Sequence, residues 1–424
     1  MGNELQVEVD SEYSRSSVPK DQRRSYANLT IVWTGYVFVI VSMMAGGGLA
    51  TGLDFKHVLL AMVIGNIFLS IIAVAISVIS CKTGLTFALL SRYSFGIKGS
   101  KIASIFVPVV NLGWYMIQAA TYGHFIAMIF HFGTVGETIS MIVSAIVMGV
   151  FAMLGFTAIT ILGYVAIPAI IFLCIATAIR SVGVMGGLEA LFQYRPETNM
   201  ALFSGITAVI GAWILSTSTC IADIMRYAKS PKQAAAATLT GLFGGNTLMI
   251  VCGAITAIAM NNSDLTEVLL GFGLIFPSII LMTTNVFTTN AANLYSTSMN
   301  LSNSFQMKRE HMMIILLVLS ALGTIAKPYE IGFLFKFLDL LGTIVPPLAG
   351  IILSDFFFVH RGKYAEFDST TFKDWNMIPW ISWIVSAVIV VLVPIGLPSL
   401  NGMILGGVLY TILMFATKKT MIEA

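Results

Sequence analysis

Twelve apolar runs, most of them roughly 20 residues long, constrain the fold of this 424-residue chain more than any other feature. A span across a bilayer needs roughly 20 mostly apolar residues, and helices satisfy their backbone hydrogen bonds internally, as hydrocarbon requires. We therefore predict an all-α polytopic membrane protein with twelve transmembrane helices. The runs fall at 29–50, 56–80, 103–130, 138–156, 157–182, 201–222, 235–260, 266–289, 311–326, 330–357, 377–398 and 401–417.

The remaining composition agrees with a chain embedded in lipid. Charged residues make up 10% of the sequence, whereas about 25% is usual for a soluble domain. A net charge of +3 indicates no nucleic-acid partner. The four cysteines stand singly, without a CxxC pair, which predicts neither disulfides nor a metal site.

Positive charges predict how the spans are oriented. With the N-terminus in the cytoplasm, 18 Lys and Arg residues fall in inside segments and four in outside segments, and Lys336, within a span, is not counted. This asymmetry follows the positive-inside rule. We expect both termini in the cytoplasm.

The chain is expected to form one transmembrane domain. Residues 1–28 and 418–424 are predicted cytoplasmic tails, and residues 29–417 form the domain, with repeat one at about 29–182, repeat two at about 201–357 and two extra helices at 377–417. Two spans contain features that weaken a helix: Gly35 with Gly46–Gly48 in the first, and the hydroxyl run Ser216–Thr219 in the sixth. Broken spans at corresponding places in two halves indicate a transporter's binding site, although small residues can also serve close packing.

The third span contains a polar group in the stretch "NLGWYMIQ". Asn111, Trp114 and Gln118 are spaced i, i+3 and i+7, so one helix face carries two amides and an indole. A flat heterocycle needs mixed donors and acceptors at its edge and an aromatic surface against its face. The alternative is that the amides join neighbouring helices.

A second polar group lies in the eighth span. Asn285, Thr288 and Thr289 share one helix face, and their oxygen atoms suit a hard cation such as sodium. The alternative is that the hydroxyls bond to carbonyls of their own helix.

Ionisable residues are rare within the spans. Asp223 and His124 are candidates for proton coupling, whereas Lys336 and Asp339, at i and i+3, are expected to pair with each other. No nucleotide-binding loop and no HExxH motif is found, so we predict no enzyme activity and no cofactor.

The residues resemble a known family. "TGLDFKHVLLAMVIGN", "SCKTGLTFALLSRYSFGIKGS", "NLGW", "IADIMRYAKSP", "TTNAANLYSTSMNLSN" and "VPPLAGIILSDFF" are together similar to the nucleobase–cation symporters, in the cytosine permease branch. The resemblance covers about residues 18–415. It implies a five-plus-five inverted-repeat (LeuT-like) fold with the first and sixth spans broken, in the inner (plasma) membrane of a bacterium.

The resemblance also implies the site residues. A second aromatic on the sixth span corresponds to Trp213, and Gln118 and "NAAN" resemble the allantoin and hydantoin transporters of the family. The expected substrate residues are then Trp114, Trp213, Asn111, Gln118, Asn290, Asn293 and Ser216. The expected sodium ligands are Gly35, Phe38, Val39, Asn285, Thr288 and Thr289.

The predicted function is import of a nucleobase, cytosine or a related purine or pyrimidine, by cation symport with sodium. The alternatives are an allantoin, hydantoin or hydroxymethylpyrimidine substrate, and coupling to protons. An amino-acid symporter of the same fold, a channel and a non-transporting ligand sensor are further alternatives.

Overall fold

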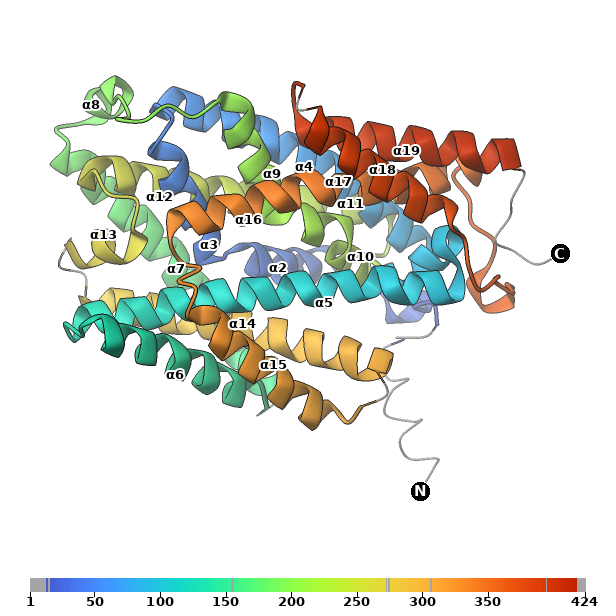
Figure 1. Cartoon of the computed structure of the whole chain (residues 1–424), viewed down its shortest axis with the longest axis horizontal. Coiled ribbons are helices and arrows are strands. Elements are labelled where there is room, and N and C mark those ends of the chain that lie inside the picture. The colour runs from blue at the N-terminus through green and yellow to red at the C-terminus, as the bar shows by residue number, and fades with distance from the viewer. Residues whose placement is uncertain are drawn as a thin grey trace.

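The computed structural model describes residues 13, 16–153, 156–271, 273, 275–305, 307–393 and 395–417. These residues form helices and no β-strand, and the longest helices lie side by side along the long axis of the molecule (Figure 1). In the first half, the α-helices are α2 (Tyr26–Val37), α3 (Ile40–Ala50), α4 (Phe55–Thr83), α5 (Phe87–Ile129), α6 (Thr134–Met153), α7 (Phe156–Val184), α8 (Leu188–Gln193), α9 (Leu202–Ser218) and α10 (Cys220–Met225). In the second half they are α11 (Pro231–Leu239), α12 (Gly245–Met260), α13 (Leu265–Gly271), α14 (Ile275–Phe305), α15 (Arg309–Thr324), α16 (Ile331–Ile344), α17 (Pro346–Ser354), α18 (Ile378–Leu392) and α19 (Pro398–Thr417).

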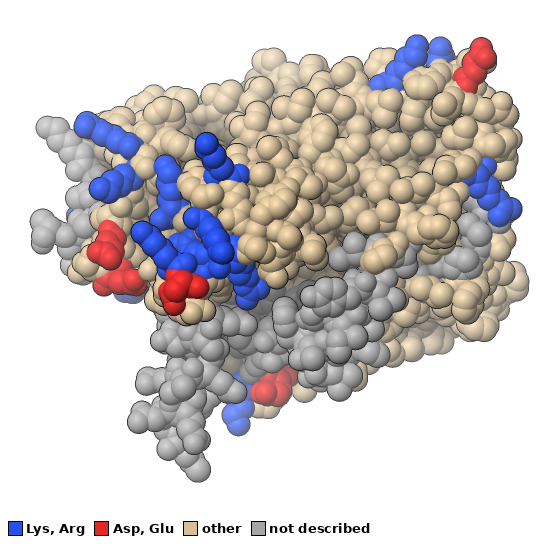
Figure 2. All heavy atoms as spheres, turned by 180° about the vertical axis from the view of Figure 1, so that it is seen from behind, with Lys and Arg blue, Asp and Glu red and all other residues tan. Residues whose placement is uncertain are grey.

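Several helices are long and apolar enough to cross a membrane. Among the described residues, five meet that description by length and composition, at 55–83, 87–129, 231–260, 331–359 and 398–417, and the pair α2 and α3 meets it as one bent span. Figure 2 shows a broad band without charged side chains across one face, with Lys and Arg gathered mainly at one end. These features are those of a multi-pass membrane protein, and the count of twelve spans stays a prediction from the sequence.

The first predicted span is interrupted between α2 and α3, which are bent by 50° relative to each other. Phe38 and Val39 leave the helical region, with ψ angles of 79° and 137°. The side chain of Asn285 in α14 bridges this break: its Oδ1 accepts from Ile40 N at 3.0 Å, and its Nδ2 donates to Phe38 O at 2.8 Å. An amide from a distant helix thus replaces the backbone hydrogen bonds that the break removes.

The glycine triplet of the first span does not interrupt it, contrary to the expectation from glycine's low helix propensity. Gly46–Gly48 lie within α3 and are buried. A Cβ atom on Gly46 would lie 2.1 Å from the carbonyl oxygen of Ile250 in α12. Gly46 therefore serves close approach of α3 and α12, as small residues do between membrane helices, whereas a Cβ atom on Gly48 would lie 2.2 Å from the ring of Phe335 in α16.

The sixth predicted span is interrupted at Thr219, which separates α9 from α10. Its backbone has φ −132° and ψ −71°, outside the helical region. The hydroxyls of Thr217 and Thr219 donate to Trp213 O at 3.0 Å and to Leu215 O at 2.7 Å. The hydroxyl run thus bonds to carbonyls of α9, the behaviour expected of Ser and Thr in a helix.

Candidate functional site

A cavity lies beside the two interruptions, among α2, α3, α5, α9 and α14. It encloses about 440 Å³ of space between atoms, part of it open to solvent. Its lining residues are Tyr36, Val39, Val41, Ser42, Asn111, Trp114, Gln118, Ala212, Trp213, Ser216, Thr289 and Asn293.

The polar face of α5 forms one wall of this cavity. Asn111, Trp114 and Gln118 all line it, which follows from their shared position on the helix. Trp114 is half-buried and packs edge-on against Phe337 of α16, with ring centroids 5.0 Å apart. Gln118 is only 2% exposed, and its Oε1 has no hydrogen-bond partner among the described residues. Burying an amide oxygen without a partner costs about 1–3 kcal/mol, and a donor that entered the cavity would offset that cost.

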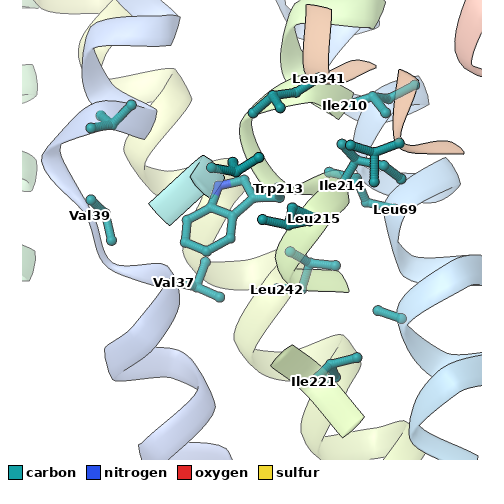
Figure 3. Packing of buried hydrophobic residues seen from close by; sticks show 14 of the residues in the cluster. Val37, Val39, Leu69, Ile210, Trp213, Ile214, Leu215, Ile221, Leu242 and Leu341 are labelled. Atoms are coloured by element: carbon teal, nitrogen blue, oxygen red, sulfur yellow. The ribbon is translucent and has the colours of Figure 1, made fainter. Parts of the chain in front are cut away.

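The opposite wall comes from α9 and the region of the first interruption. Trp213 of α9 is buried, and Figure 3 shows its indole extending toward the segment that carries Val37 and Val39. Ser216, one turn further along α9, also lines the cavity. The two indoles of Trp114 and Trp213 therefore belong to one cavity, on different helices.

The two candidate asparagines of α14 have different positions. Asn293 lines the cavity and is buried. Asn290 is not among the lining residues: its Nδ2 donates to Tyr115 O at 3.2 Å and lies 3.3 Å from Met148 Sδ. Asn290 therefore joins α14 to α5 and α6 in this structure.

Tyr36 is a lining residue that the sequence did not indicate. Its ring stacks on Trp33 at 5.5 Å and meets Trp213 edge-on at 6.0 Å. It lies in the last turn of α2, two residues before Phe38. The glycine pattern did not mark this position, and the resemblance pointed to Phe38 and Val39 as ligands but not to Tyr36.

Of the expected cation ligands, Phe38, Val39 and Asn285 lie at the first interruption, and Gly35 lies within α2. Thr289 donates its hydroxyl to Asn285 O at 2.9 Å, and the Phe38 carbonyl accepts from Asn285 Nδ2. The side chain of Thr288 lies outside the described part of the structure. A hydroxyl that donates its hydrogen still has both lone pairs, and a carbonyl oxygen that accepts one hydrogen bond still has one lone pair free. Oxygen atoms with lone pairs left over are the type of ligand that hard cations prefer.

His124, a candidate for proton coupling, belongs to a polar cluster at the end of α5 and does not line the cavity. Its Nδ1 is 2.8 Å from Glu137 Oε1 and its Nε2 is 3.1 Å from Asp264 Oδ2. Its ring stacks on Tyr329 at 4.2 Å, and Lys327 Nζ pairs with Glu137 Oε2 at 2.8 Å. The cluster joins α5 and α6 to two connecting segments.

The other intramembrane ionisable residues also lie away from the cavity. Asp223 Oδ1 accepts from Phe87 N at 3.0 Å and so caps the N-terminus of α5. Lys336 and Asp339 are both exposed, and in the part of the chain that the structure describes no ion pair joins them. The expected pairing at i and i+3 is not formed.

Comparison with known proteins agrees with this geometry. A family model described as permease for cytosine/purines, uracil, thiamine, allantoin matches residues 17–415. The cytosine permease of Escherichia coli K12 is 31% identical over 371 residues, 87% of this chain and 86% of its own. The hydantoin permease of Microbacterium maritypicum is 23% identical over 396 residues, 85% of this chain and 79% of its own.

A solved transporter has a similar fold. Mhp1, a nucleobase-cation-symport-1 family transporter, matches in its inward-facing conformation with a TM-score of 0.81 and 21% identity, covering 96% of this chain and 95% of its own. Its closed conformation with bromovinylhydantoin bound matches with a TM-score of 0.77 and 19% identity, covering 96% of each chain. At these identities the likeness concerns the fold, which is LeuT-like.

Proposed function

Because the chain belongs to the nucleobase–cation symporter family of cytosine, purine, uracil, thiamine and allantoin permeases, we propose that it imports a neutral, planar nitrogen heterocycle by cation symport. The observation that carries this proposal is the unpartnered Oε1 of Gln118 in a cavity walled by Trp114 and Trp213. The indoles stack on the ring, while Gln118, Asn111 and Asn293 bond to its edge.

The uncharged lining favours this substrate class over an amino acid. Among the described residues that line the cavity, none is Asp, Glu, Lys, Arg or His. A zwitterion would bring two charges into the site, and buried charges need partners. A nucleobase or hydantoin brings amide-like and amino groups, which the three amides can satisfy.

Within the class, cytosine is the first candidate and a hydantoin or allantoin the second. The cytosine permease of E. coli is the more similar of the two curated relatives compared above. Gln118 and Asn293 favour the second candidate, since they can bond to an imide edge with both donors and acceptors. Counterflow separates these candidates, and a complete absence of exchange would favour a ligand sensor.

That experiment uses purified protein in liposomes loaded with unlabelled compound. Cytosine, hypoxanthine, allantoin, a hydantoin and hydroxymethylpyrimidine are each tested against the labelled form outside. Exchange of at least one of them, together with a shift of the thermal unfolding midpoint by the same compound, is the expected result. Neither exchange nor a thermal shift with any of them would overturn the proposal.

The membrane arrangement follows from the same proposal. Twelve spans form two repeats, at about 29–182 and 201–357, with two further helices at 377–417. Supporting observations are the bend between α2 and α3 and the interruption at Thr219, at corresponding places in the two halves. Both tails then lie in the cytoplasm of a bacterium, and the protein lies in its inner membrane.

Sodium is the proposed coupling ion. It would be held by oxygens near the first interruption: carbonyls of Gly35, Phe38 or Val39, and groups of Asn285, Thr288 and Thr289. Thr289 also lines the substrate cavity, so ion and substrate would share a wall. A cation bound there would join α2 and α14, and coupling requires that it bind the substrate-competent state better.

Thr289→Ala is expected to remove the sodium stimulation of uptake at ordinary sodium concentrations. The sodium concentration that gives the half-maximal rate should rise at least tenfold. The variant loses a hydroxyl ligand and the hydrogen bond to Asn285 O. The control is Thr284→Ala on the same helix, whose hydroxyl also donates backward, to Ile280 O. An undiminished sodium response in Thr289→Ala would reject this cation site. Uptake by the unchanged protein that is driven by a pH gradient alone would favour proton coupling.

Gln118→Ala is expected to raise the KM for substrate about tenfold or more while the amount of folded protein stays unchanged. A lost hydrogen bond to a ligand typically costs about 0.5–1.5 kcal/mol, and more where a polar group of the ligand is left buried and unpaired. Because Gln118 Oε1 has no partner in the part of the chain that the structure describes, its loss breaks no bond of the described fold at that atom. Uptake measured against substrate concentration tests this, and an unchanged KM would exclude Gln118 from recognition.

A further inference from the structure

The indole N–H of Trp213 is bonded within the protein and not to the cavity. Nε1 donates to Ser42 Oγ of α3 and to Asn246 Oδ1 of α12, both at 2.9 Å. An indole has one donor and no acceptor, so these contacts use its whole hydrogen-bonding capacity. The ring beside Val37 and Val39 in Figure 3 therefore has only its carbon surface left for a ligand.

A chain of amides continues behind the indole. Asn246 Nδ2 donates to Asn66 Oδ1 at 2.7 Å, and Asn66 Nδ2 donates to Thr247 Oγ1 at 3.0 Å. Asn66 lies on α4, and both asparagines are fully buried. Neither of them lines the cavity.

The direction of this chain is determined by the indole. Since Trp213 can only donate, Asn246 must turn its oxygen toward it and its NH₂ group toward Asn66. A flipped Asn246 would set one donor against another and would bring its oxygen against that of Asn66. Buried polar groups that lose their partners cost about 1–3 kcal/mol each, so the chain holds a single arrangement.

We propose that Asn246, supported by Asn66, is a positioning residue for Trp213. It holds the indole so that the α9 wall offers the substrate an aromatic surface and no hydrogen-bond donor. Recognition of the substrate's polar edge is then left to the amides of α5 and α14. This inference rests on the proposed function, because the ring it positions is one of the two proposed to stack on the substrate.

The alternative is that the amides only join α4 to α12, as polar residues do between membrane helices. A double-mutant cycle distinguishes the two roles. Asn246→Ala in the otherwise unchanged protein is expected to raise the substrate KM about tenfold. In a Trp213→Phe background, which keeps an aromatic ring but has no N–H, Asn246→Ala is expected to change KM less than twofold.

A matched control tests the loss of a buried interhelical bond away from the cavity. Ser77 of α4 and Thr238 of α11 share a buried hydrogen bond of 2.7 Å. Thr238→Val removes that bond and is expected to leave KM unchanged in both backgrounds. If Asn246→Ala yields no folded protein, Asn66→Ala, which leaves Asn246 in place, is used for the same cycle.

The outcomes are separable. If Asn246→Ala raises KM equally in both backgrounds, or in neither, the positioning role is overturned. If the unchanged protein exchanges none of the five heterocycles and no heterocycle shifts its unfolding midpoint, the proposed function fails, and this inference with it. A KM effect confined to the background that retains Trp213 supports the inference.

Discussion

Trp114→Ala is expected to abolish high-affinity uptake, with a fall in kcat/KM of about 100-fold or more. Stacking of a base on an aromatic side chain is worth about 1–3 kcal/mol when measured by alanine substitution, and 2.7 kcal/mol is about 100-fold. Trp114 lines the cavity and packs against Phe337. Its loss therefore also widens the site and removes a packing contact of Phe337. Trp114→Phe keeps an aromatic face and should retain part of the uptake.

The measurement is initial-rate uptake into liposomes, combined with the thermal stability of the purified variant. Trp380→Ala is the matched control, because Trp380 is also half-buried but packs on Phe95 and Trp383, outside the cavity. It should retain uptake in proportion to the folded protein recovered. Uptake by Trp114→Ala at the rate of the unchanged protein would exclude the stacking role.

Features that depend on helical periodicity could be predicted from the sequence. The spacing of Asn111, Trp114 and Gln118 fixes them on one face of any helix that contains them, wherever that helix packs. Their common position in one cavity wall follows once α5 forms. The same holds for the apolar runs, whose length and composition predict membrane helices before any packing is known.

Features that depend on distant partners could not be predicted in this way. The interruption of the first span lies at Phe38 and Val39, where no glycine or proline marks it, because Asn285 of α14 bonds to its exposed backbone groups. Tyr36, in the last turn of α2 before that interruption, lines the cavity without any sequence motif to mark it. Tertiary contacts thus override local propensity here.

The asparagines behind Trp213 show the same limit. In the sequence, Asn66 and Asn246 are single polar residues within apolar helices, 180 positions apart. Each alone would be interpreted as an interhelical contact. Their relation to the substrate wall becomes visible only when α4, α9 and α12 are placed together, with Trp213 Nε1 at the end of the chain of amides.

The second large effect is expected in the glycine triplet. Alanine substitution at two adjacent positions, Gly46 and Gly47, is expected to change the stability of the protein in opposite directions. A Cβ atom on Gly46 would lie 2.1 Å from Ile250 O, whereas one on Gly47 would have its nearest neighbours at 3.4 Å. A backbone carbonyl within a packed helix cannot move aside as the end of a flexible side chain can. Gly46→Ala must therefore separate α3 from α12. Overpacking usually lowers the stability by about 1–3 kcal/mol, and we expect a larger loss here.

We expect Gly46→Ala to yield little folded protein and no uptake, since α3 and α12 also carry Ser42 and Asn246, which hold Trp213. Gly47→Ala should be tolerated or slightly stabilising, because alanine is favoured over glycine within a helix by about 0.5–1 kcal/mol. The recovery of monodisperse protein in detergent and its unfolding midpoint measure both variants. Equal behaviour of the two would mean that α3 and α12 are not in close contact, and would remove the packing explanation for the triplet. A loss confined to Gly46→Ala would show that glycine is needed at this position because α12 packs against it, and not because the helix needs flexibility there.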